Sequence, residues 1–334
     1  MNPILELMNR CKRGGHPVFK PGPFLPLTLM RQRGLVFNNI LRKTEDMVEA
    51  ALLSFEVGFD STTLPFDLNV EAELLGGTVN YHDEVDGTPV YPTMGLRRVE
   101  TPEDVDLSDN IVARGRLPEI VKCLRRVKEK AAFCGAVGVF LPGPFTLAGQ
   151  VMDPDQMFVM VLKKPEQIGL ILERLTELIL RIRDVYVDAG ADYVVIGEGG
   201  ATTISPPSFK TLLMPCLIKI FGDKAVPHVL SLMGRSDKYI EMILSCELDA
   251  LEVDQECTLQ AARAIVPKDL PIFSICGAYD LLAKATPDEI RATVRACLDQ
   301  GATFPVPPAD IYPPAKIENI IAFVDEVRNY AICS

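Results

Sequence analysis

The sequence predicts an α/β fold: a (β/α)8 TIM barrel with an N-terminal extension and an excursion between its second and third strands. Three observations predict it. Short segments rich in Val, Ile and Phe alternate with longer amphipathic segments, which is typical of βα units and a parallel sheet. Eight such short segments occur. No G-x-G-x-x-G motif follows an early strand, as a doubly wound nucleotide-binding sheet would require.

The eight expected strands are runs of roughly four to eight mainly apolar residues, bounded by polar turns. They lie at residues 17–22, 60–66, 136–143, 192–199, 225–233, 248–254, 271–277 and 302–308. A chain of 334 residues can bury a sizeable core, and we expect residues 1–334 to form one barrel domain.

Helical signatures separate most of these strands. The segment 164–191 has apolar residues at helical spacing and ends at Gly190. The segment 286–302 begins with Thr286 as N-cap and Pro287 at the first helical position, and acidic residues follow in the first turn. Segments 205–222 and 314–331 have the same character, and a further helix is expected around 117–133.

One interval interrupts this alternation. About seventy residues, 67–135, separate the second and third strands. They contain no Ser/Gly-rich linker that would mark a separate domain. We therefore expect an insertion that covers the mouth of the barrel.

Composition excludes several classes of function. The net charge of -11 and the pI near 4.9 argue against a nucleic-acid partner, because phosphate binding needs clustered Lys and Arg. No apolar run reaches the length of a membrane span, and the N-terminus has no secretory signal. Nine cysteines without a CxxC pair do not form a disulfide framework or a zinc ribbon. We expect a cytoplasmic protein with no membrane partner.

Active sites of such barrels lie at the carboxyl ends of the strands, so polar residues there are the candidates for chemistry. Glu198, Asp67 and Asp254 are the candidate catalytic groups. Glu198 precedes two glycines, which lets a ligand approach the backbone closely. Glu252 and Asp254 share one strand face, so at least one should point into the barrel.

For the other candidates, the sequence allows a purely structural role as well as a functional one. His228 is either a core histidine bonded to backbone or a metal ligand. Cys276 is either a small buried hydrophobe or a ligand. Glu71, in the segment "VEAELLGG", is either a solvated helix start or a substrate contact.

Five segments resemble, in order over nearly the whole chain, the uroporphyrinogen decarboxylase superfamily. They are "TLPFDLNVEAELLGG" (63–77), "LPGPFTLAGQ" (141–150), "ISPPSFKTLLMPCLIKIF" (204–221), "VPHVLSLMG" (226–234) and "PPADIYPPAKIENI" (307–320). The resemblance is closest to the corrinoid-linked branch, which includes the methylcobamide:coenzyme M methyltransferases. It implies a (β/α)8 barrel and corrinoid (cobalamin)-dependent methyl transfer in the one-carbon metabolism of an anaerobe.

In the thiol-methylating members of that branch a zinc ion is held by His-x-Cys after one strand and by a second Cys after the last strand. His228 matches the histidine, whereas Leu230 and Ala309 or Asp310 stand in place of the cysteines. The resemblance therefore implies a harder zinc site built from His228, Glu198 and Cys276, with Asp254 as a further carboxylate. Such a site suits an oxygen-linked methyl donor such as a methyl ether, with general acid catalysis by a carboxylate as the metal-free alternative.

The resemblance also implies a substrate pocket and a partner. Phe145, Glu71, Glu252 and Tyr312 are the expected substrate contacts. The chain has no D-x-H-x-x-G corrinoid-binding motif, so the corrinoid should arrive on a separate protein. A homodimer is left open.

Two other functions stay open. In a decarboxylase, Asp67 of "PFDLN" would bind pyrrole nitrogens, but Arg31 and Arg33 do not form the arginine pattern that holds the substrate carboxylates. In the second alternative the barrel has lost catalysis and serves as a binding partner.

Overall fold

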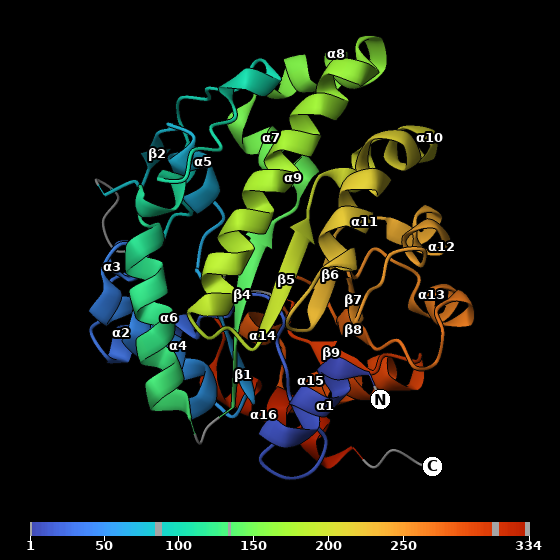
Figure 1. Cartoon of the computed structure of the whole chain (residues 1–334). Coiled ribbons are helices and arrows are strands. Elements are labelled where there is room, and N and C mark those ends of the chain that lie inside the picture. Colours follow the sequence, from blue (N-terminus) through green and yellow to red (C-terminus); the bar gives the residue numbers. More distant parts are fainter. Residues whose placement is uncertain (1, 84–88, 133–134, 309–313, 331–334) are drawn as a thin grey trace.

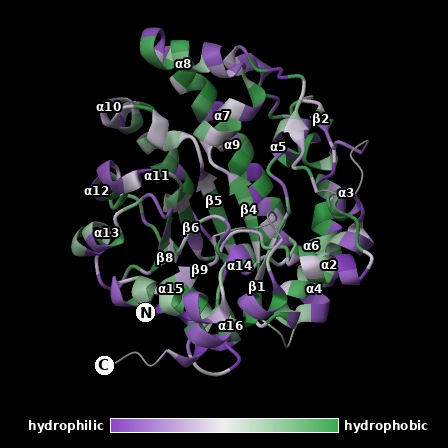
Figure 2. Cartoon of the chain, turned by 180° about the vertical axis from the view of Figure 1, so that it is seen from behind, coloured by the Kyte–Doolittle hydropathy of each residue, from purple (hydrophilic) through white to green (hydrophobic). Residues whose placement is uncertain are grey.

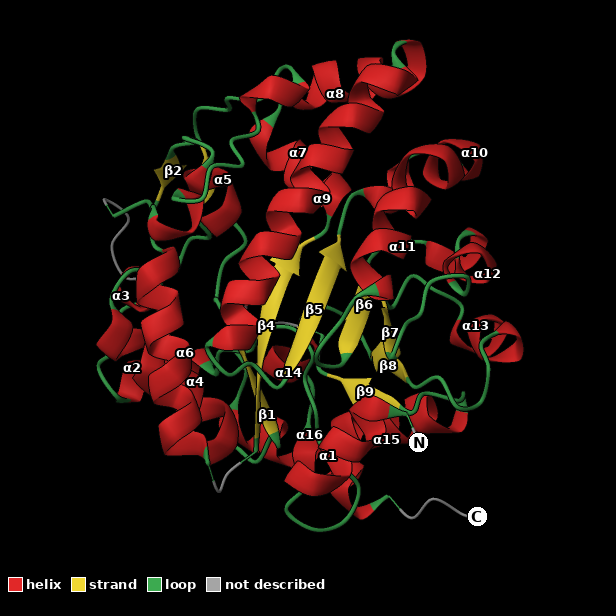
Figure 3. Ribbon diagram, in the orientation of Figure 1, coloured by secondary structure: helices red, strands yellow, loops and turns green. Residues whose placement is uncertain are grey.

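The computed structural model describes residues 2–83, 89–132, 135–308 and 314–330. At its centre is a curled parallel sheet with helices packed around the outside (Figures 1 and 3). The strands, in the order in which they pair, are β1 (Ser61–Leu64), β4 (Ala136–Pro142), β5 (Tyr193–Glu198), β6 (His228–Leu232), β7 (Ala250–Val253), β8 (Ile272–Ile275) and β9 (Phe304–Val306). The predicted α/β class and seven of the eight predicted strands are confirmed.

The prediction of a strand at 17–22 is wrong, because that segment forms no backbone ladder. The N–H of Asp60 donates to the Val18 carbonyl at 2.8 Å, so the segment does run beside the start of β1. However, the N–H groups of Val18 and Lys20 donate to side chains, Asp60 Oδ2 at 2.9 Å and Ser61 Oγ at 3.0 Å. Pro17 and Pro21 have no N–H to offer.

The same segment also reaches the other edge of the sheet. His16 Nε2 lies 3.1 Å from the Thr303 carbonyl oxygen, and its ring stacks on that of Phe304 in β9 at 5.1 Å between centroids. Residues 16–22 therefore connect the two edge strands, β1 and β9, mainly through side chains.

The helices around the sheet present apolar faces inward and hydrophilic faces outward (Figure 2). Those that follow the expected segments are α6 (Leu117–Ala131), α9 (Pro165–Asp188), α15 (Pro287–Asp299) and α16 (Ile317–Asn329). The Thr286 hydroxyl caps α15 as predicted, and α9 ends just before Gly190, whose φ is +102°. The remaining helices are α1 (Pro3–Cys11), α2 (Leu27–Gln32), α3 (Phe37–Ile40), α4 (Thr44–Glu56), α7 (Pro144–Val151), α8 (Pro154–Lys163), α12 (Ile240–Ile243), α13 (Leu259–Ile265) and α14 (Leu281–Lys284).

The helix expected at 205–222 is divided. It consists of α10 (Pro206–Ser208), a π-turn at Phe209–Leu213 and α11 (Met214–Gly222). Pro215 lacks the N–H that a continuous α-helix would use there, which accounts for the π-turn that precedes it. No described helix is both apolar and long enough to cross a membrane.

The interval between β1 and β4 contains α5 (Val70–Leu74), an antiparallel pair of short strands, β2 (Val79–Asn80) and β3 (Thr93–Met94), two 3-10 turns (Pro102–Asp104 and Ile111–Ala113) and α6. Figure 1 shows α5 and β2 toward the end of the sheet to which the strand arrows point. Two further 3-10 turns lie elsewhere in the described chain, at Ala201–Thr203 and Ser236–Lys238.

The interior of the curled sheet holds its own apolar cluster, to which α1 contributes Ile4, Leu7 and Met8. Tyr193 fills much of this space: its hydroxyl lies 2.6 Å from Thr63 Oγ1. A Cβ at Gly138 would fall 2.2 Å from the Tyr193 ring, so only glycine fits there. The amino end of the interior is therefore packed, which leaves the carboxyl end for ligands.

Candidate active site at the carboxyl end of the sheet

Alternate residues of each strand face the interior of the sheet. Val195 of β5, Val229 of β6 and Ala250 of β7 belong to the interior cluster. Two residues further along each strand, the same face carries Gly197, Ser231 and Glu252, which are paired in register. A polar layer therefore lies above the apolar one, closer to the carboxyl end.

A buried ion pair lies in this layer. Lys20 Nζ is 3.8 Å from Glu252 Oε1, and the two residues are 5% and 2% exposed. A buried charge is costly unless it is paired, so the opposite charges of Lys20 and Glu252 offset the cost of burying each other. The structure thus places the candidate Glu252 in the interior. Sequence reasoning missed Lys20, although a lysine within the apolar segment "PVFKPG" was a signal of the same kind as Glu252.

Asp254 shares that strand face but has a different set of contacts. Its Oδ2 accepts a hydrogen bond from Gly234 N at 3.0 Å and its Oδ1 accepts one from Glu256 N at 3.3 Å. Gly234 has a φ of +78°, which favours glycine. Asp254 therefore fixes the loop that follows β6.

Asp67 follows β1 and lies in a separate cluster of charged side chains. The guanidinium of Arg116 donates two parallel hydrogen bonds to its carboxylate, at 3.0 and 2.8 Å, and Asp67 is fully buried. Arg116 also donates to Glu73 Oε2 and to the Leu41 carbonyl, both at 2.7 Å. Such bidentate pairs are among the stronger hydrogen-bonded contacts in proteins. Both oxygens of the candidate catalytic Asp67 are thus bound to Arg116.

Glu71 lies next to this cluster, on α5. It is 1% exposed, and its Oε1 accepts no hydrogen bond from the part of the chain that the structure describes. Burial, with a smaller effect from the charge of Asp67, raises the pKa of Glu71 to about 8. At neutral pH this carboxyl group is mainly protonated, so it can donate a proton.

Glu198 ends β5 and binds the first turn of α7. Its carboxylate accepts hydrogen bonds from Phe145 N at 3.1 Å and from Thr146 N at 3.0 Å. A Cβ at Gly143 would fall 2.4 Å from Glu198 Cδ, so glycine is needed for this approach. Burial raises the pKa of Glu198 to about 7 even though these hydrogen bonds lower it.

The strand alternation directs Glu198 away from the interior and toward α7. Phe145 was expected to contact substrate. It is 1% exposed, and its ring lies edge-on to the Phe158 ring of α8, with 6.3 Å between the two ring centroids. It packs between α7 and α8. The sequence placed Phe145 after a strand, and Glu198 is the last residue of β5, but the sequence did not resolve the face on which their side chains lie.

His228 lies at the amino end of β6, whereas Glu198 lies at the carboxyl end of the neighbouring strand β5. It opens β6 opposite Val194, whereas Glu198 pairs with Leu232, four residues further on, or about 13 Å along a strand. Its Nδ1 is 2.7 Å from the Val226 carbonyl oxygen, and its ring packs edge-on against Phe221 of α11. Burial lowers the pKa of His228 to about 4. This is the core histidine that the sequence left as one of its alternatives.

Cys276, the third expected zinc ligand, follows β8 on the outer face of the sheet. Its thiol donates to the Val306 carbonyl at 3.5 Å and lies beside Cys297 of α15. His228, Glu198 and Cys276 are therefore not brought together. Within the described residues no group of three or more His, Cys, Asp or Glu side chains could hold a metal ion.

The carboxyl end of β6 explains this difference. Ser231 lies near the carboxyl end of β6 and Met233 follows the strand, whereas His228 opens it. A hydroxyl and a thioether are poor zinc ligands. The residues that the structure describes at this end do not fit a zinc ion. Tyr312, Ala309 and Asp310 lie outside the described residues.

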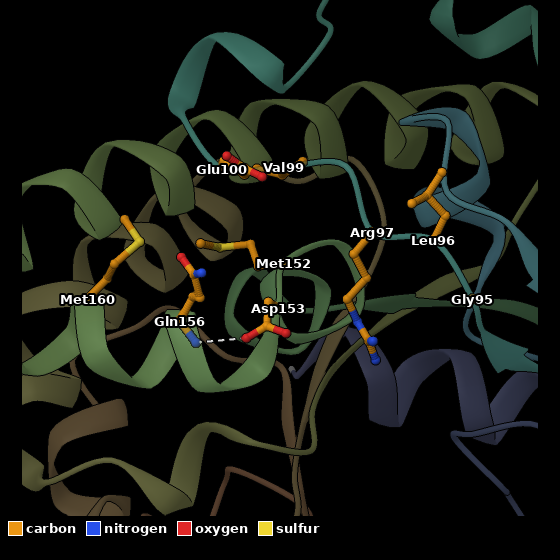
Figure 4. Close-up of a pocket in the computed structure, with 9 residues that line it drawn as sticks. All are labelled: Gly95, Leu96, Arg97, Val99, Glu100, Met152, Asp153, Gln156 and Met160. Atoms are coloured by element: carbon orange, nitrogen blue, oxygen red, sulfur yellow. Dashed lines mark hydrogen bonds between the residues drawn. The ribbon is translucent and has the colours of Figure 1, made fainter.

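Two cavities lie away from the interior of the sheet. One of about 270 Å³ lies between residues 95–100 and the α7–α8 connection, where Gln156 N donates to Asp153 Oδ1 (Figure 4). It is smaller than the roughly 300 Å³ at which small-molecule sites begin. The other, of about 700 Å³, is lined by residues of α1, His16, Thr303 and Arg328 at the amino end of the sheet. That is the opposite end from the usual position of barrel active sites.

Comparison with known proteins places the chain among relatives of two activities. The profile of the uroporphyrinogen decarboxylase family (URO-D) matches residues 2–330. A methylcobamide:CoM methyltransferase of Methanosarcina barkeri is 25% identical over 306 residues, 89% of this chain and 88% of that protein. A uroporphyrinogen decarboxylase of Anaeromyxobacter dehalogenans is 24% identical over 339 residues, 93% of this chain and 96% of that protein.

A solved structure supports the fold. The structure titled "methyltransferase from Methanosarcina mazei" superposes with a TM-score of 0.87 at 22% identity and covers 97% of both chains. At this identity the likeness bears on the fold alone.

Proposed function

The chain belongs to the uroporphyrinogen decarboxylase family, and on that basis we propose that it is a methyltransferase that works with a corrinoid protein. It moves a methyl group between a small methylated substrate and the cobalt of the separate corrinoid protein. An oxygen-linked donor, such as a methyl ether, is the substrate class that suits the interior best. The cytoplasm is the proposed location.

The observation that carries this choice over decarboxylation is the buried pair Lys20–Glu252. A substrate with several carboxylates needs an excess of cations around it. In the interior the ammonium of Lys20 is balanced by Glu252. Arg31 and Arg33, the arginines of the N-terminal segment, are exposed on or next to α2. A neutral methylated molecule fits this interior better than a polycarboxylate.

The proposed chemistry is a displacement at the methyl carbon. The reduced cobalt of the partner attacks that carbon, the carbon–oxygen bond breaks, and the oxygen keeps the electron pair. The Lys20 ammonium stabilises the developing negative charge on that oxygen and donates a proton to it. Glu252 holds Lys20 in place. Zinc has no part in this proposal, because the described residues do not fit it.

The surrounding structure supports the approach of a partner from the carboxyl end. We propose that residues 17–22 complete the (β/α)8 barrel between β1 and β9, and that residues 67–135 cover its mouth, all within one domain. The corrinoid protein then docks over this mouth. Self-association into a homodimer would have to leave it open.

The test is an activity screen. The purified chain is incubated with a reduced corrinoid protein and with methanol, methoxy-aromatics, methylamines or methyl thioethers, and methyl-corrinoid is followed by its absorbance. Uroporphyrinogen is assayed in parallel for loss of carboxyl groups. Methylation with an oxygen-linked donor is the expected result. Decarboxylation, or no turnover with any donor, would instead favour the decarboxylase or the non-catalytic binding partner.

A further inference from the structure

Two cysteines outside the proposed active site form a dithiol between β8 and α15. We propose that Cys276 and Cys297 are a modification site at which a small peroxide forms an intramolecular disulfide. The proposal does not depend on the proposed function, because neither residue faces the interior of the sheet.

The geometry brings the two thiols together. Phe273 belongs to the interior cluster and Ile275 packs against it, so these two residues of β8 face inward. Because side chains alternate along a strand, Cys276 lies on the outer face of the sheet. The Cys297 thiol, on α15, points back toward the same strand and lies 3.9 Å from the Ser274 carbonyl oxygen. Cys276 and Cys297 line the same cavity of about 180 Å³. A disulfide requires the two sulfurs to approach to ~2.05 Å, and the shared cavity lies between the strand and the helix that carry them.

The two thiols are not equivalent. The interaction with Cys276 lowers the pKa of Cys297, and the interaction with Cys297, together with burial, raises the pKa of Cys276. The thiolate is the reactive form of cysteine, so Cys297 is the nucleophile and Cys276 resolves the intermediate.

A small reagent can reach the pair. A cavity of about 180 Å³ is lined by Cys276 and Cys297 together with Cys257, Gln255 and Gln300. All three cysteines are less than 10% exposed, so a bulky reagent has poor access. A peroxide matches the size of this cavity, whereas a protein oxidant does not.

The reaction balances with hydrogen peroxide as the oxidant. The Cys297 thiolate attacks one peroxide oxygen, the O–O bond breaks, and the leaving hydroxide takes a proton to become water. The resulting sulfenic acid is attacked by the Cys276 sulfur. The S–S bond forms, the S–O bond breaks, and a second water leaves. The two thiols lose two electrons and the peroxide gains them.

The bond would join the carboxyl end of β8 to α15. The chain between them contains Gly277, whose φ is +82°, and the short helix α14. Oxidation therefore fixes the loop that leaves β8 at the carboxyl end of the sheet.

The test uses the intact chain. After brief treatment with hydrogen peroxide, the protein is denatured, alkylated and weighed, and its peptides are mapped without reduction. We expect the alkylatable thiols to fall from nine to seven, with one linked peptide pair containing Cys276 and Cys297. Reduction should restore all nine. Cys297→Ser should abolish the linkage, whereas Cys246→Ser, at a buried thiol elsewhere, should leave it unchanged.

Mapping of the wild-type chain decides the outcome even where a variant folds poorly. A linkage between other cysteines, or oxidation of methionines with all nine thiols intact, would overturn the proposal. So would a linkage that persists in Cys297→Ser.

Discussion

Glu198 accepts two hydrogen bonds from a single residue, Thr146: one from its backbone N–H at 3.0 Å and one from its hydroxyl at 2.9 Å. The same hydroxyl accepts a hydrogen bond from Gly199 N at 2.8 Å. These contacts join the carboxyl end of β5 to the first turn of α7. Glu198 therefore has a structural task at the rim of the proposed site.

Glu198 gives the first prediction. Burial raises its pKa to about 7 from the ordinary 4.5, so the folded protein binds this proton more tightly than the unfolded chain does. The resulting stabilisation is complete below pH 4.5 and is lost as pH rises to about 7, a change of about 3 kcal/mol. In Glu198→Gln that decline should be absent. Urea unfolding at pH 5 and pH 8 measures it, with the exposed Glu173→Gln as control; parallel pH profiles in all three proteins would contradict it.

The pair Asp67–Arg116 gives the second prediction. Arg116→Met leaves the fully buried Asp67 without its cation and should lower the free energy of unfolding by about 3–5 kcal/mol. The double variant Asp67→Asn/Arg116→Met should recover part of that loss. At the exposed pair Arg33–Glu56, Arg33→Met should cost less than about 1 kcal/mol. Equal losses at the two pairs would show that the buried contact is not the cause.

His228 gives the third prediction. Burial lowers its pKa to about 4 from 6.5, so its contribution to stability is complete above pH 6.5 and is lost as pH falls toward 4. His228→Asn should weaken this acid-side loss, while His16, whose pKa burial also lowers, keeps a remainder. Urea unfolding between pH 4 and 7 measures the difference. Metal analysis of both proteins should find the same zinc content; zinc bound by the wild-type chain and lost in the variant would restore His228 as a ligand.

Lys20 and Glu252 give the fourth prediction. Lys20→Met should lower kcat for methyl transfer by about 10²–10³-fold, because the leaving oxygen loses its proton donor. Glu252→Gln should lower kcat less, since the ammonium remains. Lys130→Met, at an exposed ion pair with Glu49, is the control. Circular dichroism verifies folding, and a folded Lys20→Met protein with unchanged kcat would remove Lys20 from the mechanism.

The sequence predicted the periodic parts of the fold well. Helices α9 and α15 and seven strands follow from apolar spacing and from caps such as Thr286. It failed at residues 17–22, where the composition resembles a strand but Asp60 and Ser61 side chains take the N–H groups that a ladder would use. That replacement depends on residues forty positions away and has no local signature.

The directions and partners of the site side chains were less predictable, because they also depend on residues far away in the sequence. Period-two alternation led to the expectation that at least one of Glu252 and Asp254 points inward, and the structure places Glu252 in the interior. The direction of Glu198 depends on α7, and the partner of Asp67 is Arg116, forty-nine residues further on. His228 was expected within the strand at 225–233, whereas it opens β6, because its position within an apolar run does not define where the ladder begins.

The most direct test of the account is a single-turnover reaction. The chain, a reduced corrinoid protein and an isotopically methyl-labelled methyl ether are mixed in equal amounts, and the label on cobalt is measured over time. The account predicts one label per corrinoid protein with wild-type chain, and a rate at least about a hundred-fold lower with Lys20→Met. No label on cobalt from any methylated donor, with label retained in the ether, would contradict it.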